Sequence, residues 1–417
     1  MTRPDAVLDA LRAAAGGAAR PAGDGDAIAG VPARYVASPA TAGEAAAVVR
    51  VAAERDLALV ARGAGTKQGW GGAPRRLDLV IDTGRLAGVV EHEAGDLIAV
   101  VRAGTSAADL AGKLGAAGQQ LALDLPLAGA TIGGTVAVGT SGPRRLLYGT
   151  VRDLLIGIRL VRPDGTLVRA GGKVVKNVAG YDLGKLLTGS YGTLGLIVEC
   201  AFRLHPLPAA TAVLRRQVPG PVDAGRLVAA VRAAQVVPSA VEVDAPAGGP
   251  VEVAVLLEGV PAGVAQRAAA TAGLLGAQTV VADAAPDWWA AYPWPAGGVG
   301  IKLTAALSGV PAVLAAAAAA RDRHGVAVAV RGSAGAGVLY AGLPAATGLA
   351  AVIAVLADLR AATATAGGHA VVLTAPAPIR DAVDLWGPIA GLDLMRRMKL
   401  QFDPHARFAP GRFVGGI

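Results

Sequence analysis

The sequence predicts an α+β protein with two domains, the second of which is built around an antiparallel sheet. Two observations support this prediction. Short apolar runs alternate with Ala-rich helical segments along the 417 residues, and the composition changes near residue 208, at the proline-containing run "LHPLP". A chain of this length can form two or three domains with sizeable cores. We place the first domain at 1–208, the second at 209–378 and a C-terminal segment at 379–417.

Helices are expected to alternate with short strands in the first domain. Residues 38–61 predict an Ala-rich helix with Val48, Val49 and Ala52 on one face, followed by a buried strand. A glycine-dense block at 126–142 has no assigned element. The other expected elements are strands at 77–82 and 97–104, a helix at 106–118 between Ser106 and Gly118, a hairpin at 153–171 around Pro163-Asp164-Gly165, a short helix at 181–190 and a strand at 194–208.

The second domain also alternates the two kinds of element, an order typical of an antiparallel sheet with helices on one face. One helix is expected to start at Ser308 as its N-cap and to stop at Gly325. The remaining expected elements are strands at 251–259 and 299–305, a helix at 261–275, hairpin-like strands at 326–342, a helix at 346–363 and a strand at 369–376. The C-terminal segment has helical spacing as far as Phe402.

The charge pattern argues against nucleic acid as a partner. The net charge is +8, but the basic residues form scattered arginine doublets, and aromatic residues make up only 4%. This charge is either solvated surface or an attraction for an anionic ligand or an acidic partner. Asp5 and Asp9 stand where a signal peptide would need its apolar core, and glycines and Pro344 interrupt the longest uncharged run, 332–357. We expect a cytoplasmic protein without a transmembrane segment.

Metal and iron–sulfur centres are not expected in this chain. The single cysteine, Cys200, cannot hold an iron–sulfur cluster by itself. The five histidines show neither H-x-H nor H-E-x-x-H spacing, so we predict no metal site.

Two glycine-rich blocks, "ARGAGTKQGWGG" at 61–72 and "PLAGATIGGTVAVGTSG" at 126–142, are the most informative feature of the first domain. Each lies beside an apolar strand, where bare backbone N–H groups can converge on an anion. A single such block is usually only a tight turn, but two of them favour a diphosphate-containing cofactor. Neither block fits G-x-x-x-x-G-K-[ST] or a G-x-G-x-x-G fingerprint. The sequence therefore predicts a dinucleotide or flavin held in a different fold.

The ordered motifs identify a family resemblance over about residues 30–208. The succession 62–66, 130–134, 141–142, 148–149 with Asp153, and "KNVAGYDLGKLLTGSYGTLGLIVE" at 176–199 resembles the vanillyl-alcohol-oxidase/PCMH-type flavoproteins. Within them, "SGPRR", "YGTVRD" and "KNVAGYDL" are most similar to the FAD-binding E subunits of bacterial glycolate oxidases. The closing "FDPHARFAPGRF" is similar to the family's C-terminal signature, with Ala409 where Asn is usual. UDP-N-acetylmuramate reductase, which shares the flavin fold, is a more distant alternative.

This resemblance implies an α+β fold with a PCMH-type, two-subdomain FAD-binding domain at 1–208 and an α+β cap domain with an antiparallel sheet at 209–378. The segment at 379–417 would return to the FAD domain. The resemblance also implies non-covalent FAD, because Thr66 and Gly129 occupy the positions where some members carry the linking His or Cys.

Individual FAD contacts follow from the same resemblance. Arg62, Gly63, Ala64, Gly65 and Thr66 would wrap the pyrophosphate. Thr131, Gly133 and Gly134 would hold pyrophosphate and ribose from the other side, Ser141, Tyr148 and Gly149 would follow the ribityl and isoalloxazine region, and Gly195, Leu196 and Ile197 would meet the adenine end. Pro126 and Asp153 complete the implied cofactor-binding set.

The substrate site is less well defined by the sequence. Related hydroxy-acid dehydrogenases carry a Gly-Asp-Gly-Asn…His metal motif, where this chain has "RGSAGAGVLYAG" at 331–342. Arg144, followed by Arg145, is a candidate clamp for a substrate carboxylate, and Lys176 is a second weak candidate. The alternatives for the arginine pair are an exposed basic turn or a contact with an FAD phosphate or a partner. No catalytic residue is assigned.

Three functions remain open at this level. The first is the FAD subunit of a glycolate oxidase-like complex that oxidises glycolate or D-lactate beside a sister flavoprotein and passes electrons to an iron–sulfur subunit. Such a complex would be cytoplasmic or peripheral to the inner face of the cell membrane. The second is a self-sufficient FAD oxidoreductase for a hydroxy acid or alcohol, and the third is an FAD-bearing accessory subunit without substrate chemistry.

Overall fold

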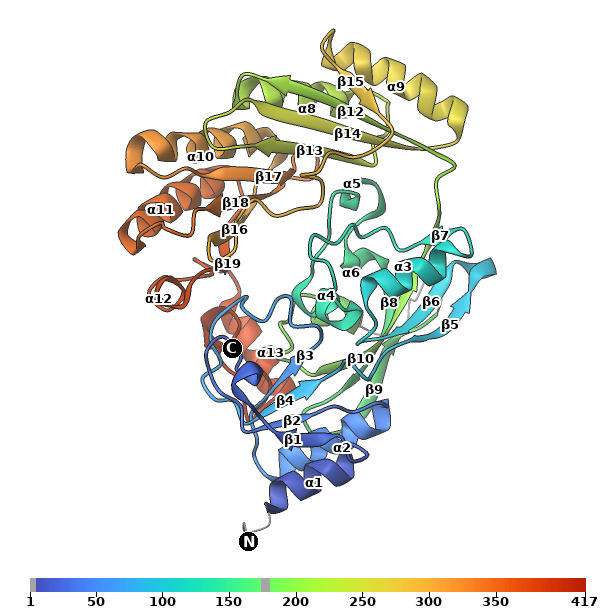
Figure 1. The fold of residues 1–417 in the computed structure, drawn as a ribbon, viewed down its shortest axis with the longest axis vertical. Coiled ribbons are helices and arrows are strands. Elements are labelled where there is room, and N and C mark those ends of the chain that lie inside the picture. The colour runs from blue at the N-terminus through green and yellow to red at the C-terminus, as the bar shows by residue number, and fades with distance from the viewer. Residues whose placement is uncertain (1–4, 174–180) are drawn as a thin grey trace.

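The computed structural model describes residues 5–173 and 181–417. Figure 1 shows two parts that lie one above the other: a lower part, which contains the N-terminus and α13, and an upper part, the cap, which we define as residues 210–385. Each part has its own hydrophobic core. One core extends to Leu204 and includes Phe408 from the C-terminal segment, and the other runs from Ala212 to Leu385. The chain therefore passes from one core to the other between residues 204 and 212.

The lower part contains two larger sheets among the described residues. The first has the order β1-β2-β4-β3 and is mixed, because β2 and β3 run parallel to β4. The second has the order β5-β6-β10-β8-β9 and is antiparallel throughout. The strands are β1 Ala19–Pro21, β2 Tyr35–Ala37, β3 Leu59–Arg62, β4 Leu79–Asp82, β5 Val89–Glu93, β6 Ile98–Arg102, β7 Gln119–Gln120, β8 Leu155–Val161, β9 Leu167–Gly171, β10 Leu196–Arg203 and β11 His205–Pro206.

Helices of the lower part begin where the sequence supplies caps. Thr41 accepts a hydrogen bond from the Glu44 amide at the start of α2, and Ser106 accepts one from Asp109 at the start of α3. Asp182 caps α7, since its side chain accepts a hydrogen bond from the Lys185 amide, and the neighbouring Tyr181 is exposed. The helices are α1 Ala6–Ala14, α2 Ala42–Glu54, α3 Ala107–Gly115, α4 Ile132–Val138, α5 Arg145–Tyr148, α6 Val151–Leu154 and α7 Leu183–Leu187. The helix and strand expected within 38–61 and the helices expected at 106–118 and 181–190 are confirmed.

Helix α4 lies inside the glycine-dense block for which the sequence assigned no element. Thr131 is its N-cap, and Gly139, with φ of +65°, ends it. A Cβ at Gly133 would lie only 2.6 Å from the Ala103 Cβ. Glycine is therefore used here for close packing of a helix against β6 and its following turn, not to break the helix.

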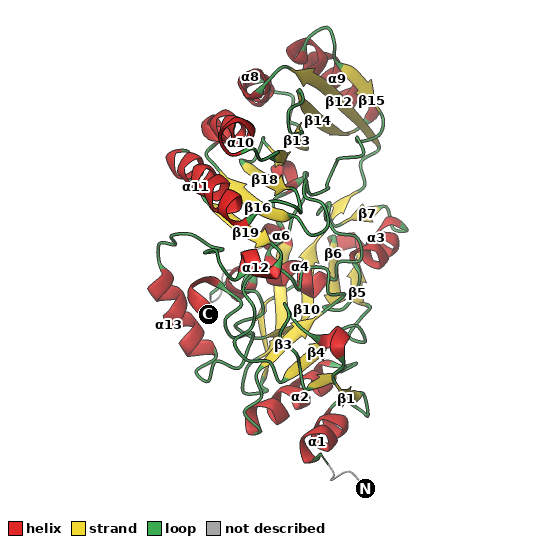
Figure 2. Ribbon diagram, turned by 60° about the vertical axis from the view of Figure 1, so that its left-hand side comes forward, coloured by secondary structure: helices red, strands yellow, loops and turns green. Residues whose placement is uncertain are grey.

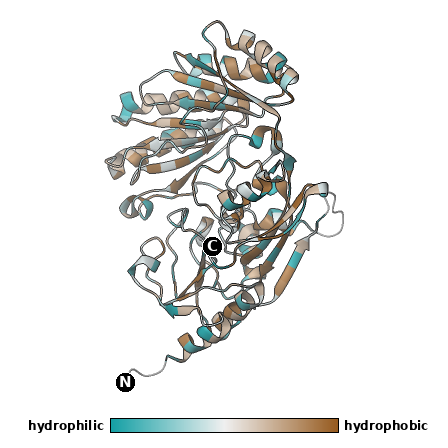
Figure 3. Cartoon of the chain, turned by 45° about the vertical axis from the view of Figure 1, so that its right-hand side comes forward, coloured by the Kyte–Doolittle hydropathy of each residue, from teal (hydrophilic) through white to brown (hydrophobic). Residues whose placement is uncertain are grey.

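The cap contains a large antiparallel sheet with the strand order β15-β12-β14-β13-β17-β18-β16-β19. Its strands are β12 Ala210–Val218, β13 Ala240–Ala245, β14 Val251–Gly259, β15 Val280–Ala282, β16 Val299–Thr304, β17 Ala329–Ser333, β18 Val338–Leu343 and β19 Ala370–Thr374. Figure 3 shows hydrophobic residues along many of these strands. The predicted α+β class and the antiparallel sheet of the second domain are confirmed.

Four long helices cover the cap sheet: α8 Pro221–Ala233, α9 Pro261–Leu275, α10 Val310–His324 and α11 Leu349–Thr365. Figures 1 and 2 show α8, α10 and α11 on the side of the sheet away from the lower part, while α5 of the lower part contacts β13. The prediction of Ser308 as an N-cap is wrong. Ser308 lies in a short 3-10 turn, Leu307–Gly309, and Gly309 is the cap. The elements from β12 to β13 had no predicted counterpart.

The C-terminal segment extends from the cap to the lower part. It contains α12 Ala377–Arg380 and α13 Leu392–Phe402, followed by turns. The amide of Leu59 donates to the carbonyl of Arg407, and the amide of Ala409 donates to the carbonyl of Leu59, so the segment adds a short bridge beside β3. Within the described ranges, no helix is both long and apolar enough to cross a membrane.

Candidate functional site

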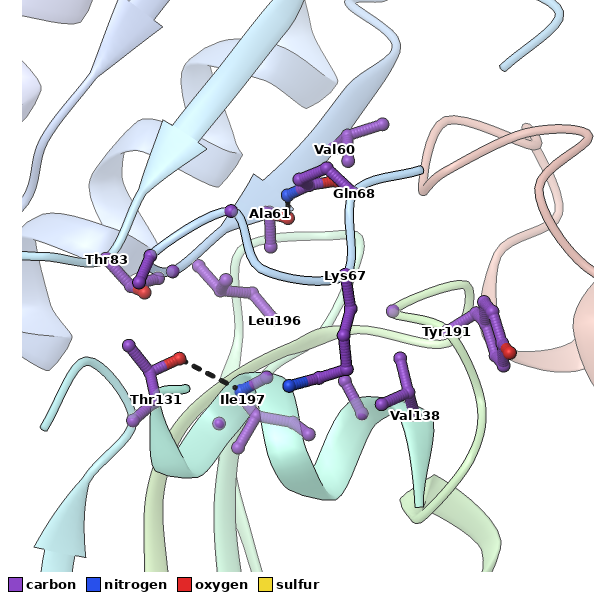
Figure 4. A pocket seen from close by; sticks show the side chains of 18 of the residues that line it. Val60, Ala61, Lys67, Gln68, Thr83, Thr131, Val138, Tyr191, Leu196 and Ile197 are labelled. Atoms are coloured by element: carbon purple, nitrogen blue, oxygen red, sulfur yellow. Dashed lines mark hydrogen bonds between the residues drawn. The ribbon is translucent and has the colours of Figure 1, made fainter. Parts of the chain in front are cut away.

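A cleft opens in the lower part between the loop after β3, helix α4 and the turn before β10. The space among its lining residues, counted together with the solvent at its opening, is about 790 Å³. Figure 4 shows Thr83, Thr131, Val138, Tyr191, Leu196 and Ile197 around this cleft. The glycine loop at 61–72 and the glycine-dense block at 126–142 therefore face each other, although they lie far apart in sequence.

The loop after β3 presents a row of free backbone donors. Within the described residues, no protein acceptor receives the amide N–H groups of residues 63–67. Gly65 has φ of +75°, the left-handed conformation that lets successive amides turn toward one point. Such concave runs of N–H groups bind anions, and the diphosphate of a dinucleotide is an anion of the right kind.

Glycine is required where the two loops approach each other. A Cβ at Gly63 would collide with the side chain of Thr131, whose Oγ1 accepts a hydrogen bond from the Gly134 amide at 3.3 Å. A Cβ at Gly195 would lie 2.8 Å from Leu160 Cδ1. These contacts keep side chains out of the cleft walls and leave backbone at the surface.

Two buried cations, Lys67 and Arg412, line the cleft. Burial lowers the pKa of Lys67 to about 8, since no carboxylate among the described residues offsets the cost. Figure 4 shows the Lys67 side chain extending across the cleft to α4. Burial also lowers the pKa of Arg412 to about 10. Its Nη2 donates to the carbonyls of Gln68 and Trp70, while its buried Nη1 has no partner in residues 5–173 and 181–417. Unpaired buried cations beside free amides fit a diphosphate-containing ligand.

The cleft brings together ten of the residues that the sequence assigned to cofactor binding: Gly63, Ala64, Gly65, Thr66, Thr131, Gly133, Gly134, Gly195, Leu196 and Ile197. Arg62 points elsewhere. Its guanidinium pairs with Asp26 and Asp82, each at 3.0 Å. These ion pairs hold the start of the loop against β4, which contains Asp82, and leave the Arg62 guanidinium unavailable for a cofactor phosphate.

The sequence reasoning missed the other residues that line the cleft, among them Lys67, Gln68, Thr83, Tyr191, Gly192 and Arg412. Lys67 directly follows the predicted loop, and Arg412 lies in the C-terminal "APGRF" motif, so both carried a signal in the sequence. Tyr191 belongs to the "GSYGTLG" run, but its ring contacts Trp386 and Phe413, which only the folded chain brings to it.

Arg144 lies in an ionic network between the lower part and the cap. Its guanidinium pairs with Asp124 at 2.5 Å and with Glu258 of β14 at 3.4 Å, and it also bonds Gln120. Burial and the nearby Glu258 raise the pKa of Tyr148 to about 12, and the Tyr148 ring packs edge-on against His205. With two carboxylates already beside it, the Arg144 guanidinium has little capacity left for a substrate carboxylate. The sequence analysis did not predict this network, either as a substrate clamp or among the alternatives for the arginine pair.

The other predicted contacts lie away from the cleft. Pro126 and Ser141 line a second pocket where the lower part meets the cap, and Ser141 Oγ accepts a hydrogen bond from the Val151 amide at 2.8 Å. Asp153 accepts from the Thr150 amide and hydroxyl at the start of α6. Gly149, at φ of +85°, provides the turn between α5 and α6. Lys176 lies outside the described residues. Within the described ranges, no group of three or more His, Cys, Asp or Glu residues is placed to hold a metal ion.

Comparison with known proteins identifies the cleft-bearing part. Residues 33–171 match the family model of the FAD binding domain. The chain is 43% identical over 133 residues to glycolate oxidase subunit GlcE of Escherichia coli, which covers 31% of this chain and 38% of that protein. It is 32% identical over 208 residues to glycolate oxidase subunit GlcD of Bacillus subtilis, covering 50% and 44%. The matches thus span less than half the length of these relatives.

Solved structures extend the likeness to the whole fold. The substrate-bound structure of p-cresol methylhydroxylase matches with a TM-score of 0.76 at 15% identity, over 97% of this chain and 96% of that one. A chitooligosaccharide oxidase matches with a TM-score of 0.69 at 16% identity, over 97% and 98%. The family resemblance predicted from the motifs is confirmed. Residues 33–171 form an FAD binding domain, and the chain has the two-part fold of the PCMH-type flavoproteins.

Proposed function

We propose that the chain is the FAD-binding subunit of a glycolate oxidase-like complex that oxidises a small 2-hydroxy acid, glycolate or D-lactate, and passes electrons to a partner iron–sulfur subunit. The carrying observation is the cleft, in which free amides at 63–67 and two buried cations fit the FAD diphosphate. The similarity to a glycolate oxidase subunit supports the substrate class. A cytoplasmic location, with attachment to the inner face of the membrane only through the complex, belongs to the same proposal.

Residue roles follow from the positions around the cleft. The loop at 62–66 would hold the diphosphate through its backbone, Thr131, Gly133 and Gly134 would approach it from α4, and Leu196 with Ile197 would contact the adenine end. Thr66, which lines the cleft, has no side chain suited to a flavin linkage, so we propose non-covalent binding. Lys67 and Arg412 are added to the set because they bring positive charge to the same cleft.

The chemistry divides between cofactor and protein. FAD, held by the loop at 62–66 and by Thr131, Gly133 and Gly134, would supply the two-electron oxidation of the hydroxy acid to a 2-oxo acid. The chain's part is to bind and orient both molecules. With one cysteine, Cys200, buried in the core, the sequence offers no ligand set for an iron–sulfur cluster. In this proposal the electrons continue through a partner subunit.

A second candidate is an accessory FAD subunit whose catalytic partner is a sister flavoprotein. The observation that favours it is the hairpin of β17 and β18, where "RGSAGAGVLYAG" offers no metal ligand. A self-sufficient oxidoreductase is the third candidate.

Anaerobic flavin bleaching tests the proposal. The purified complex, loaded with FAD, should lose its flavin absorbance when glycolate or D-lactate is added, and the isolated chain should react slowly until the sister flavoprotein is supplied. Reduction that is equally fast in the isolated chain and insensitive to chelators would identify a self-sufficient enzyme. Reduction that requires only the sister subunit's flavin, with this chain's FAD removed, would identify an accessory subunit.

Lys67 should make FAD affinity depend on pH. The pKa of Lys67 is about 8, and a bound diphosphate favours the ammonium form, so FAD affinity should be constant below pH 7 and fall as pH rises through 8 and 9. Lys67→Gln should bind FAD about tenfold more weakly at pH 7, or 1.4 kcal/mol, without this pH dependence.

Quenching of FAD fluorescence by the apoprotein measures this effect between pH 6 and 9.5. Lys113→Gln, a change at an exposed lysine of α3, is the matched control and should behave as wild type. A wild-type affinity that stays constant up to pH 9.5 would show that Lys67 does not face the diphosphate.

A further inference from the structure

The second pocket lies between the lower part and the cap and has no role in the proposals above. The space among its lining residues, counted together with the solvent at its opening, is about 340 Å³. From the lower part it is lined by Ser141 and Arg145. From the cap it is lined by Glu242 of β13, Ser333 of β17, Tyr340 of β18 and Tyr292, which lies in the loop before β16. Both parts of the chain must therefore be in place for this pocket to form.

Three buried polar atoms of the residues that line this pocket have no hydrogen-bond partner within the described part of the chain. They are Glu242 Oε1, Ser333 Oγ and the Tyr292 hydroxyl oxygen. Nearly all buried polar groups of folded proteins are hydrogen-bonded, and an unpaired one is costly. Their convergence on one cavity indicates a polar ligand that supplies the missing partners.

The pocket also holds a cation with unused donors. Arg145 Nε donates to the Gly142 carbonyl at 2.9 Å, and Nη2 contacts the Tyr340 hydroxyl at 3.3 Å, which orients the guanidinium. Among the described residues, Arg145 forms no ion pair within 4 Å, in contrast to its neighbour Arg144 and to Arg331, which pairs with Asp244 at 2.8 Å. A carboxylate in the pocket would therefore find a free, pre-oriented guanidinium.

We propose that this pocket binds the 2-hydroxy acid, with Arg145 holding its carboxylate and Glu242 with Ser333 holding its hydroxyl group. The assignment rests on the proposed function and adds to it the residues that recognise the substrate. The arginine of the sequence motif that acts as the clamp is thus Arg145, because Arg144 is occupied by Asp124 and Glu258.

Glu242 can stand beside an anion only while it is protonated. Burial raises the pKa of Glu242 to about 8, with Asp124 raising it further and Ser333 and Arg145 opposing the rise. The other titratable groups lining its pocket are Arg331, Tyr292 and Tyr340. At neutral pH the carboxylic acid is uncharged and can exchange hydrogen bonds with a hydroxyl group. Above pH 8 the carboxylate forms, repels the ligand carboxylate and weakens binding.

The test uses 2-hydroxyisobutyrate, which has no hydrogen on C2 and cannot be oxidised. Calorimetric titration of the FAD-loaded protein should show binding that Arg145→Gln weakens at least tenfold and Arg145→Lys weakens less. Trp288 lines the pocket and provides a fluorescence readout. Arg396→Gln, at an exposed arginine of α13, is the matched control and should leave the affinity unchanged. Unchanged affinity in a folded, FAD-loaded Arg145→Gln would overturn the assignment.

Glu242→Gln separates binding from packing. The amide is neutral at every pH, so this variant should keep wild-type affinity at pH 7 and lose the decline above pH 8. Ser333→Ala should weaken binding and move that decline to higher pH, because Ser333 opposes the rise of the Glu242 pKa. Wild-type affinity that stays constant to pH 9.5 would remove Glu242 from the site.

If 2-hydroxyisobutyrate binds as expected but glycolate never bleaches the flavin, the pocket assignment stands and the proposed function fails. If glycolate bleaches it with unchanged KM in Arg145→Gln, the function stands and the pocket fails.

Discussion

Gly65→Asp is expected to give a folded, colourless protein that retains no FAD. Gly65 lies in the loop whose free amides face the cleft, and no atom of the described residues lies within 4 Å of a Cβ built at this position, so a side chain would collide with no neighbour. An aspartate would bring a negative charge to the site proposed for the diphosphate and would strain the left-handed backbone. We expect FAD affinity to fall on the order of a hundredfold or more, which corresponds to about 2.8 kcal/mol.

The measurement is the FAD released by acid per mole of purified protein, together with the visible spectrum. Gly118→Asp is the matched control. Gly118 also has positive φ, +68°, and open space around it, but it lies in the turn after α3 and does not line the cleft. It carries the same backbone strain and the same new charge, and it should keep its flavin. Wild-type FAD content in Gly65→Asp would show that this loop does not hold the diphosphate, and flavin that stays with the precipitated polypeptide would contradict non-covalent binding.

Asp403→Ala is expected to destabilise the protein by about 3–5 kcal/mol, the usual cost of leaving a buried charge unpaired. Asp403 is 1% exposed, and its carboxylate accepts hydrogen bonds from Lys399 Nζ at 2.7 Å and from the Phe408 amide at 2.8 Å. Lys399 Nζ also donates to the carbonyls of Thr193 and Phe408. This single ammonium therefore joins the C-terminal segment to the turn that precedes β10.

Loss of this junction should also lower FAD retention, because Gly192 and Gly195, which flank Thr193, line the cleft, as does Arg412 from the C-terminal segment. Urea unfolding measures the loss of stability, and FAD content measures the loss of cofactor.

Asp393→Ala is the control, since Asp393 lies on the same helix, α13. Its carboxylate is 90% exposed and pairs only with Arg396, so it should change stability by less than about 1 kcal/mol. The double variant Lys399→Met/Asp403→Ala should lose less free energy of unfolding than the two single variants lose together. Fully additive losses would show that the two side chains do not interact.

Most elements of the fold could be predicted where a local signal was complete. The hairpin around Pro163-Asp164-Gly165 and the helix after Ser106 have their turn and capping residues within a few positions. Helix α4 was missed because its glycines resemble a loop, and only the close approach of Ala103 shows why they are there. The predicted N-cap at Ser308 failed for a related reason: the tertiary structure places a 3-10 turn before the helix, so Gly309 occupies the cap.

The sequence by itself determined the glycine loops, the absence of a cysteine set for an iron–sulfur cluster and, through its ordered motifs, the FAD binding domain. These features depend on short stretches of chain whose backbone chemistry is local. Only the tertiary structure distinguished Arg144 from Arg145. The two are adjacent in sequence, yet Arg144 meets Glu258 of the cap, whereas Arg145 faces a pocket with Glu242. The partners of a charge are chosen by how distant segments pack, and that packing decides which arginine is paired and which is free.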